Sequence, residues 1–181
     1  SEYKSNIQRI VSLGNSETSH ISVKELENGI VGMLGNKLEV KSEIKGENNL
    51  IVGSQLSLNS DLQKALQTDF DKISNEGFII KSINLKNKKQ LIISGKNDVS
   101  VLYGVFTFLR LMQTNKSIQN LNITDSPKTN IRILNHWDNL DRTVERGYAG
   151  ASIWDWWALP EIADRRYTDY ARANASLGIN G

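Results

Sequence analysis

The residues best suited to chemistry gather in two aromatic and polar clusters near the end of the chain. The first cluster is the run 135–139 (NHWDN) and the second is the run 154–157 (WDWW), with Arg142, Glu145 and Arg146 between them. Aromatic faces beside hydrogen-bonding groups suit sugar rings, which have one face of C–H groups and a rim of hydroxyls. A guanidinium group is well suited to clamping a carboxylate. The two clusters therefore predict a sugar-binding site.

Each feature of these clusters also has a purely structural explanation. The Trp137 indole can fill a protein interior as well as contact a sugar, and His136 is more often a hydrogen-bonded structural residue than a catalyst. Glu145 and Arg146 are adjacent, so a local ion pair or a solvated face is the default. Among residues 154–157, at least one indole is expected in the core and at least one against the ligand, because three buried indoles would each need an N–H partner.

Other kinds of site are excluded by what the sequence lacks. The chain has no cysteine, and its two histidines, His20 and His136, are far apart, so neither a metal site nor a thiol nucleophile is expected. Residues 147–150 (GYAG) lack the Lys-Ser/Thr ending of a phosphate loop, and Ser152 does not lie in a Gly-x-Ser-x-Gly motif. These absences argue against a metal site, a phosphate-binding loop and a serine nucleophile elbow.

Charge and hydropathy exclude two classes of partner. The 22 basic and 20 acidic residues nearly balance at a net charge of +2, which gives no basic surface for nucleic acid. No apolar run approaches the roughly 20 residues needed to span a bilayer, so no membrane partner is expected. The polar N-terminus carries no signal peptide, and the absence of cysteine fits a periplasmic or secreted protein as well as a cytoplasmic one. A homodimer stays open.

The first two-thirds of the chain alternates short apolar runs with helical periodicity. Ser22 and Glu25 predict a capping box, Gly35 a helix end and Ser60 a second helix start. The pattern indicates an α/β sandwich with a mixed sheet. The expected strands are 7–13, 38–44, 50–52, 78–83 and 91–94, and the expected helices are 22–34, 60–73 and 98–112, the last with Val99, Leu102, Phe106 and Leu109 facing inward.

Residues 113–130 are polar, include Pro127 and predict a linker. The boundary is placed between a domain over residues 1–126 and a second over residues 127–181. In the second domain we expect a strand at 131–134, a helix at 165–177 with Tyr170, Ala171 and Leu177 buried, and a new strand from Ile179. This order is one βα unit and the start of another, and it places residues 135–139 at the strand end where ligands usually bind.

The stretch from Arg132 to Gly181 resembles the start of the catalytic barrel in the α-glucuronidases of glycoside hydrolase family 67. The resemblance is carried by RILNHWDN (132–139), ERGYAG (145–150), SIWDW (152–156), Leu159-Pro160, DYAR (169–172), Ala175-Ser176 and GING (178–181). The first domain is more loosely similar to the α/β domain that precedes the barrel in several exo-acting glycosidases.

The resemblance implies an inverting exo-glycosidase that uses neither a metal nor an organic cofactor. Such enzymes cleave the α-1,2 bond between glucuronic acid, or its 4-O-methyl form, and the terminal xylose of xylo-oligosaccharides, with one carboxylic acid and one carboxylate base. In this chain it implies that Trp154, Asp138, Asn139 and Arg146 contact the substrate. Arg142 and Trp157 differ from the family pattern we expect and would reshape the rim of the site.

No catalytic residue is assigned. A (β/α)₈ barrel needs about 250 residues, so residues 127–181 would be a truncated barrel, and the family's acid and base lie on later strands. We therefore expect the chain alone to be inactive and to need the rest of the catalytic barrel as a partner. The alternatives are a non-catalytic carbohydrate-binding or scaffolding module and an exo-glycosidase of another family.

Overall fold

The computed structural model describes residues 2–181, which form two compact units. Unit 1 extends to Lys128, and unit 2 runs from Thr129 to Gly181. Unit 1 contains a six-stranded sheet with helices, whereas the only helix of unit 2 is α5 (Arg165–Ser176). Within the described part of the chain, no helix is long and apolar enough to cross a membrane.

The sheet of unit 1 is mixed, as predicted. Its order is β2-β1-β3-β5-β4-β6; the first four strands run parallel, while β4 pairs antiparallel with both β5 and β6. The chain passes through a helix between β1 and β2 and again between β3 and β4, whereas the antiparallel β4 and β5 are joined by a tight turn. The strands are β1 (Arg9–Ser12), β2 (Glu39–Lys41), β3 (Asn49–Ser54), β4 (Phe78–Leu85), β5 (Lys88–Gly95) and β6 (Asn122–Asp125).

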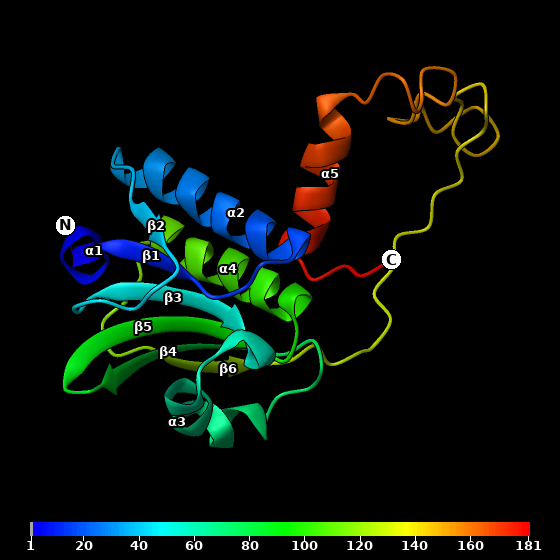
Figure 1. The fold of residues 1–181 in the computed structure, drawn as a ribbon. Coiled ribbons are helices and arrows are strands. Elements are labelled where there is room, and N and C mark those ends of the chain that lie inside the picture. The colour runs from blue at the N-terminus through cyan, green and yellow to red at the C-terminus, as the bar shows by residue number, and fades with distance from the viewer. Residues whose placement is uncertain (1) are drawn as a thin grey trace. The chain divides into compact units, whose positions relative to one another are not determined.

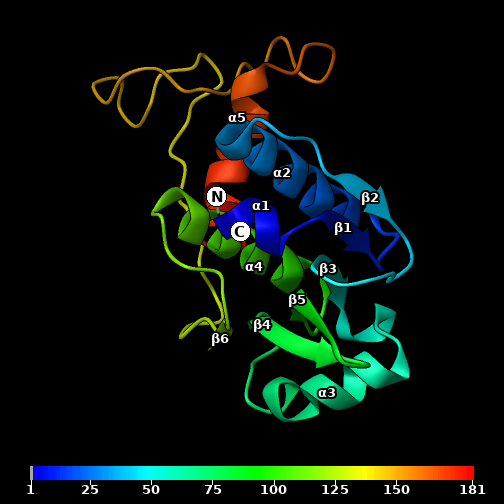
Figure 2. The same ribbon diagram turned by 90° about the vertical axis from the view of Figure 1, so that its left-hand side faces the viewer.

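Helices cover both faces of the sheet, which makes unit 1 an α/β sandwich. Helices α2 (Glu17–Leu34) and α4 (Asp98–Gln113) lie on one face, and α3 (Ser60–Phe70) lies on the other (Figure 1). The view turned by 90° shows the same separation (Figure 2). Short helices α1 (Glu2–Asn6) and η1 (Gln55–Ser57) complete the unit.

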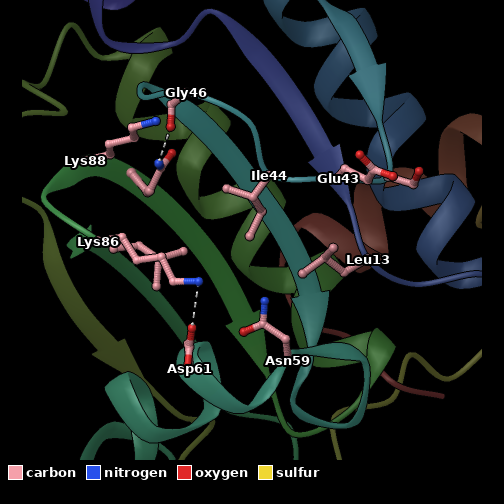
Figure 3. Close-up of a pocket in the computed structure, with 11 residues that line it drawn as sticks. Leu13, Glu43, Ile44, Gly46, Asn59, Asp61, Lys86 and Lys88 are labelled. Atoms are coloured by element: carbon pink, nitrogen blue, oxygen red, sulfur yellow. Dashed lines mark hydrogen bonds and ion pairs between the residues drawn. The ribbon is translucent and has the colours of Figure 1, made fainter.

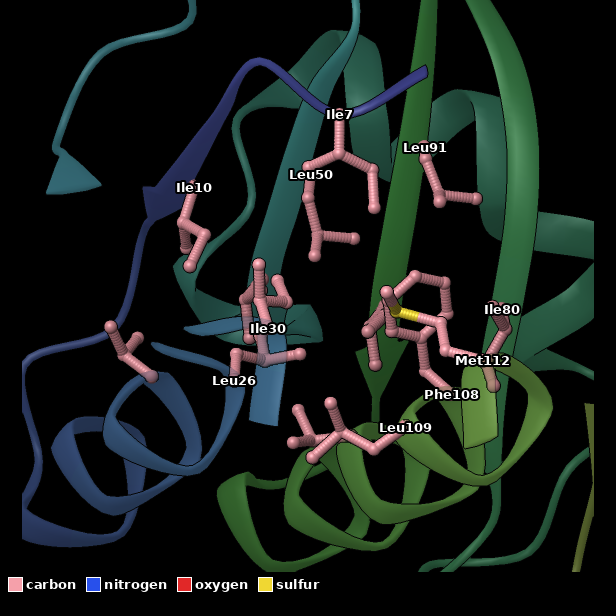
Figure 4. Close-up of a cluster of buried hydrophobic side chains, with 14 of the residues drawn as sticks. Ile7, Ile10, Leu26, Ile30, Leu50, Ile80, Leu91, Phe108, Leu109 and Met112 are labelled. Carbon is pink, nitrogen blue, oxygen red and sulfur yellow. The ribbon is translucent and has the colours of Figure 1, made fainter. Parts of the chain in front are cut away.

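Two apolar clusters fill the spaces between the sheet and its helices. Alternate strand residues point to opposite faces, so Leu50 joins the cluster under α2 and α4 while Ile51 joins the cluster under α3. In the first cluster, Leu26 of α2 and Phe108 of α4 lie over the strands (Figure 4). In the second, Leu66 of α3 is fully buried. These buried side chains provide most of the driving force for folding of unit 1.

Two of the predicted helix starts are wrong. Helix α2 is capped by Ser16, whose Oγ accepts from the Ser19 amide at 3.1 Å, and Ser22 lies inside the helix and donates to the Thr18 carbonyl. The cap of α3 is Asn59 rather than Ser60. In both cases the true cap residue lies before the first apolar residue of the helical pattern, so the pattern alone places the start too late. The end of α2 at Gly35, in the left-handed region at φ 63°, is confirmed.

The inward face predicted for α4 is also wrong, apart from Leu109. Val99 is 41% exposed, whereas Val101, Val105 and Phe108 are buried. The helix is apolar on several sides, so its periodicity allows more than one buried stripe. Gly104 decides between them, because a Cβ there would lie 2.9 Å from Cγ2 of Ile93; the helix therefore approaches the sheet on the glycine side.

The segment predicted as a linker contains a strand. Asn122–Asp125 forms β6, which pairs with β4 in the register Ile80↔Ile123. Ile123 is partly buried against the first core cluster, and the other three residues of the strand are polar. An edge strand buries little, so its sequence does not differ enough from a polar loop for composition to identify it.

Unit 2 has helix α5 as predicted, but the expected strand at residues 131–134 is absent from the described structure. This segment is extended beside the chain end: the Asn180 amide donates to the Arg132 carbonyl at 2.8 Å, and the Leu134 amide donates to Gly181 at 3.1 Å. These two backbone hydrogen bonds are too few to form a β-ladder, so the segment is not a strand. The prediction that Ala171 and Leu177 are buried is wrong, since both are exposed, and Tyr170 is only partly buried.

Candidate functional site

The two predicted clusters lie in one loop of unit 2 that is folded by its own hydrogen bonds. Isolated β-bridges join Asp138 to Val144 and Thr143 to Ala151. The Glu145 amide donates to the Trp137 carbonyl at 2.7 Å, directly beside the first of these bridges. The backbone of Glu145 is left-handed, at φ 58°, as is that of Arg142. The loop is therefore an ordered turn structure that holds the side chains of the site in fixed directions.

Trp154 lies at the centre of an aromatic cluster. Its ring stacks on Tyr167, with centroids 4.8 Å apart and planes inclined by 29°, and it meets Tyr170 edge-on at 5.7 Å. The two tyrosines are three residues apart on α5 and therefore on one face of that helix. His136 approaches the same indole edge-on at 6.1 Å, and Trp156 lies at 6.3 Å. Helix α5 thus positions Trp154.

Polar contacts connect this aromatic cluster to the first predicted cluster. The Tyr170 hydroxyl is hydrogen-bonded to Nε2 of His136, whose Nδ1 lies 3.4 Å from Oδ2 of Asp138. Ser152 donates its hydroxyl to the same Asp138 oxygen at 2.8 Å and accepts from the Trp154 amide at 2.9 Å. His136 therefore has a hydrogen bond at Nε2 and a carboxylate near Nδ1, as a structural histidine would.

The predicted residues Asp138 and Trp154 are brought together by these contacts. The side chain of Asp138 is only 9% exposed, and Trp154 is partly buried. The carboxylate of Asp138 is held by Ser152, so it is a fixed acceptor at the edge of the aromatic cluster.

Asn139 and Arg146 have different surroundings. Asn139 uses its Nδ2 within the loop, donating to Oγ1 of Thr143 and to the Glu145 carbonyl at 2.9 and 2.8 Å, while Arg146 is exposed. Of the two arrangements expected for Glu145 and Arg146, an ion pair or a solvated face, the structure has Arg146 on a solvated face, while Glu145 accepts from the Tyr148 hydroxyl at 2.7 Å. That bond raises the pKa of Tyr148. Arg146 is thus an available guanidinium on the loop surface.

Arg142 holds the second cluster, residues 154–157, through Asp155. Its Nη1 donates to Oδ2 of Asp155 at 3.1 Å, and Asp155 donates its amide to the Tyr167 hydroxyl at 2.8 Å. Asp141 accepts from the hydroxyl and then the amide of Thr143, and these bonds lower the pKa of Asp141. The carboxylates of this loop are therefore engaged in holding it together.

Several apolar side chains of unit 2 remain exposed. Trp157 is 82% exposed, Trp137 59% and Trp156 44%. Trp137 therefore does not fill an interior in this chain, and the indole that belongs to the packed cluster is Trp154. Among residues 2–181, no group of three His, Asp or Glu side chains is arranged to hold a metal ion.

The sequence reasoning missed Ser152 and Tyr167. Ser152 is buried at 5% exposure and links Asp138 to the Trp154 backbone. Nothing in the composition of the loop distinguishes this serine from a surface residue. For Tyr167, a signal was present: it lies three residues before Tyr170 on a predicted helix, so the two had to share a face.

Comparison with known proteins identifies the family of both units. Residues 1–108 match the model of the glycosyl hydrolase family 67 N-terminus, and residues 111–181 match that of the family 67 middle domain. A probable alpha-glucuronidase A of Aspergillus terreus is 30% identical over 179 residues, which cover 96% of this chain and 20% of the relative. One of Aspergillus clavatus is 32% identical over 183 residues, covering 98% and 21%. The chain thus spans about a fifth of the length of these relatives.

Solved structures with low sequence identity share the fold. A family GH115 4-O-methyl-α-glucuronidase with specificity for decorated arabinogalactans matches with a TM-score of 0.58 at 14% identity, over 96% of this chain and 24% of that one. A GH138 enzyme targeting pectin rhamnogalacturonan II matches with a TM-score of 0.59, also at 14% identity, over 95% and 18%. The fold alone is common to these enzymes, whereas the two family models cover this sequence almost completely; the chain belongs to glycosyl hydrolase family 67.

Proposed function

We propose that this chain is the front part of an α-glucuronidase. The parent enzyme would release glucuronic acid, or its 4-O-methyl form, from the α-1,2 bond to the terminal xylose of xylo-oligosaccharides. Membership of family 67 and the names of the relatives support the glucuronidase activity. The xylan-derived substrate and the inverting course come from the resemblance of residues 132–181 to family 67 enzymes.

The loop of unit 2 is proposed as one wall of the sugar site. The observation that carries this proposal is the fixed cluster in which Ser152 connects Asp138 to Trp154. Tyr167 covers one face of the Trp154 indole, and the remaining exposed surface of the ring would contact the sugar. Asp138 would accept a sugar hydroxyl, and Arg146 would bind the uronate carboxylate. Asn139 would contribute its carboxamide oxygen, because its Nδ2 is already used within the loop.

Residues 127–181 are proposed as the first βα unit of a (β/α)₈ barrel and the onset of the second. The backbone bonds between Arg132, Leu134 and the chain end support this, because neighbouring barrel strands run side by side in the same way. Inverting catalysis needs an acid and a base roughly 6.5–9.5 Å apart, and both would come from the remaining barrel, the required partner. We propose a periplasmic or secreted location for the parent, with a cytoplasmic location as the alternative.

Glucuronic acid release tests this proposal. The 181-residue chain and the full protein encoded by the same reading frame are incubated with aldouronic acids, and the anomer released first is followed by proton NMR. We expect release only from the full protein, with inverted configuration. Equal turnover by the chain alone would refute the view that the acid and base lie elsewhere.

Calorimetric titration of the chain with xylo-oligosaccharides separates this function from a binding module. Saturable binding of unsubstituted oligosaccharides, together with an inactive full protein, would establish the non-catalytic alternative. We expect instead that binding requires the uronate substituent, because Arg146 offers the only described guanidinium in the 135–157 loop that is free of an ion pair.

A further inference from the structure

Unit 1 contains a pocket of about 380 Å³ on the α3 side of the sheet (Figure 3). Its walls come from the loop that follows β2, the start of α3 and the turn between β4 and β5. This volume is at the lower end of the range for small-molecule sites. The lining residues are Leu13, Ser42, Glu43, Ile44, Gly46, Asn59, Asp61, Leu85, Lys86, Lys88 and Gln90.

One part of this wall is apolar. Leu13, Ile44 and Leu85 are partly buried at the margin of the second core cluster, and their outer surfaces line the pocket. In Figure 3, Leu13 and Ile44 lie on the same side of it. Such aliphatic surface suits the C–H face of a small ring and offers no aromatic plane to a larger one.

The floor and one corner supply amide groups. Gln90 is 2% exposed and is held in place: its Oε1 accepts from Asn49 at 2.8 Å, and its Nε2 donates to the Gly46 carbonyl at 2.9 Å. Asn59 caps α3 through Oδ1, which accepts from the Leu62 amide at 3.0 Å. The capping bond fixes the orientation of the carboxamide, so the Nδ2 of Asn59 is left as a donor toward the pocket (Figure 3).

The pocket is lined by two acidic and two basic side chains, but these four groups are not all paired with one another. Lys86 lies 3.4 Å from Asp61, and Glu43 is paired with Lys45 at 2.8 Å. Lys88 has no ion pair within the described residues. It is the first residue of β5, two residues before Gln90. The lining therefore contains one lysine without an ion pair, together with an amide donor and an aliphatic wall.

We propose that this pocket binds a single carboxylate-bearing sugar, a uronate, separately from the Trp154 loop. Lys88 would hold the carboxylate, while Asn59 and the hydroxyl of Ser42 would bind ring hydroxyls. Ile44 and Leu13 would cover the C–H face. The choice of a uronate among small carboxylated rings rests on the proposed glucuronidase function. The pocket itself, with its volume and its unpaired lysine, is observed independently of that function.

Backbone amide NMR and tryptophan fluorescence together test this inference on the 181-residue chain titrated with glucuronate. All four tryptophans lie between Trp137 and Trp157, so fluorescence reports only unit 2. We expect saturable amide shifts at Gly46, Asn59 and Lys88 whether or not the fluorescence changes. Amide shifts in the pocket without a fluorescence change would count against the site in unit 2 but support the pocket. A fluorescence change without amide shifts in the pocket would refute the pocket proposal and leave the site in unit 2 standing.

Matched variants and ligands decide whether the pocket is specific. Lys88→Glu should weaken glucuronate binding at the pocket by about tenfold or more, since it replaces an attractive charge with a repulsive one. Lys24→Glu makes the same charge change on an exposed position of α2, on the other face of the sheet, and should alter the affinity by less than about twofold. Two control ligands separate the parts of glucuronate: acetate has the carboxylate without the ring, and glucose has the ring without the carboxylate. Equal shifts with acetate would mean an adventitious anion only, and equal losses in both variants would refute the role of Lys88.

Discussion

The indole of Trp154 and the phenol ring of Tyr167 stack at 4.8 Å across thirteen residues of sequence, and this pair joins the WDWW cluster to helix α5. Through this stack, Trp154 in the loop packs against α5, the helix that follows the loop in sequence. The order of the loop therefore depends on a helix in which no residue is fully buried. Unit 2 is stabilised by such ring contacts more than by an aliphatic core.

Trp154→Ala should loosen unit 2. The substitution removes the stack on Tyr167 and the edge contacts, and we expect a loss of about 2 kcal/mol in local stability. Amide hydrogen exchange in α5 measures it directly. Trp157→Ala removes an equally large side chain that is 82% exposed, and exchange in α5 should stay unchanged. Equal acceleration in both variants would contradict the central position of Trp154.

Gly104→Ala should destabilise unit 1 although alanine is the better helix former. The new Cβ would lie 2.9 Å from Cγ2 of Ile93 and 3.2 Å from Cβ of Phe78, so the helix would have to move away from the sheet. We expect a loss of about 1–2 kcal/mol in the free energy of unfolding by urea.

Gly32→Ala is the matched control for this substitution. No atom lies within 4 Å of a Cβ built at Gly32 in α2. The same chemical change should therefore raise stability by up to about 1 kcal/mol. A gain in both variants would show that α4 does not need the close approach at Gly104.

Asp98 should make the stability of unit 1 depend on pH. Burial acts to raise the pKa of Asp98, but hydrogen bonds from Ser16, Ser54 and Ser19 outweigh it and hold the pKa below 3.8. The carboxylate therefore stabilises the fold above that value, and the contribution is lost as the pH falls through the folded-state pKa. The bond from Ser16, at 2.7 Å, connects the first turn of α4 to the cap of α2.

Urea unfolding of wild type and Asp98→Asn over a pH series checks this. The variant should be less stable near neutral pH, and the difference should shrink below about pH 4. Glu47→Gln removes an exposed carboxylate that makes no described contact and should follow the wild-type curve. A difference between wild type and Asp98→Asn that does not change with pH would contradict the assignment.

Asp69→Ala should cost about 2 kcal/mol of stability. Asp69 is nearly buried, at 7% side-chain exposure, and accepts from Lys81 at 2.6 Å, so removing it leaves the ammonium group without its partner beside the second core cluster. Thermal unfolding measures the effect. The Glu43–Lys45 pair is nearly as short, at 2.8 Å, but its side chains are 68% and 75% exposed, and Glu43→Ala should leave the unfolding curve unchanged.

Sequence patterns predicted the buried elements of unit 1 far better than its edges. Strands such as β3 and β5 carry unbroken apolar runs, which predict them correctly, whereas β6 has one apolar residue, Ile123, and its composition predicts a linker. The wrong face of α4 has another cause. Periodicity selects a stripe only when the other side is polar, and here Gly104 decided the face through a close contact that is visible only in three dimensions.

The candidate site shows the same division. Residue types located both clusters and named Trp154 and Asp138, because all four tryptophans of the chain fall between Trp137 and Trp157 with carboxylates beside them. The connection through Ser152 could not be predicted, since it depends on the path of a loop with left-handed residues at Arg142 and Glu145. The strand expected at 131–134 failed for a physical reason: a strand is defined by its partners, and this segment has only a few bonds to the chain end.

The strand order of the sheet also bears on how unit 1 folds. At one side, β4 and β5 are joined by the two-residue turn Lys86-Asn87, both left-handed, so their pairing closes a very short loop. At the other side, β1 can meet β3 only after α2 has been placed across them. We expect the hairpin to form early and to offer β5 as a template, on which β3 and then β1 and β2 assemble, so that the N-terminal end of the chain is the last to join the sheet.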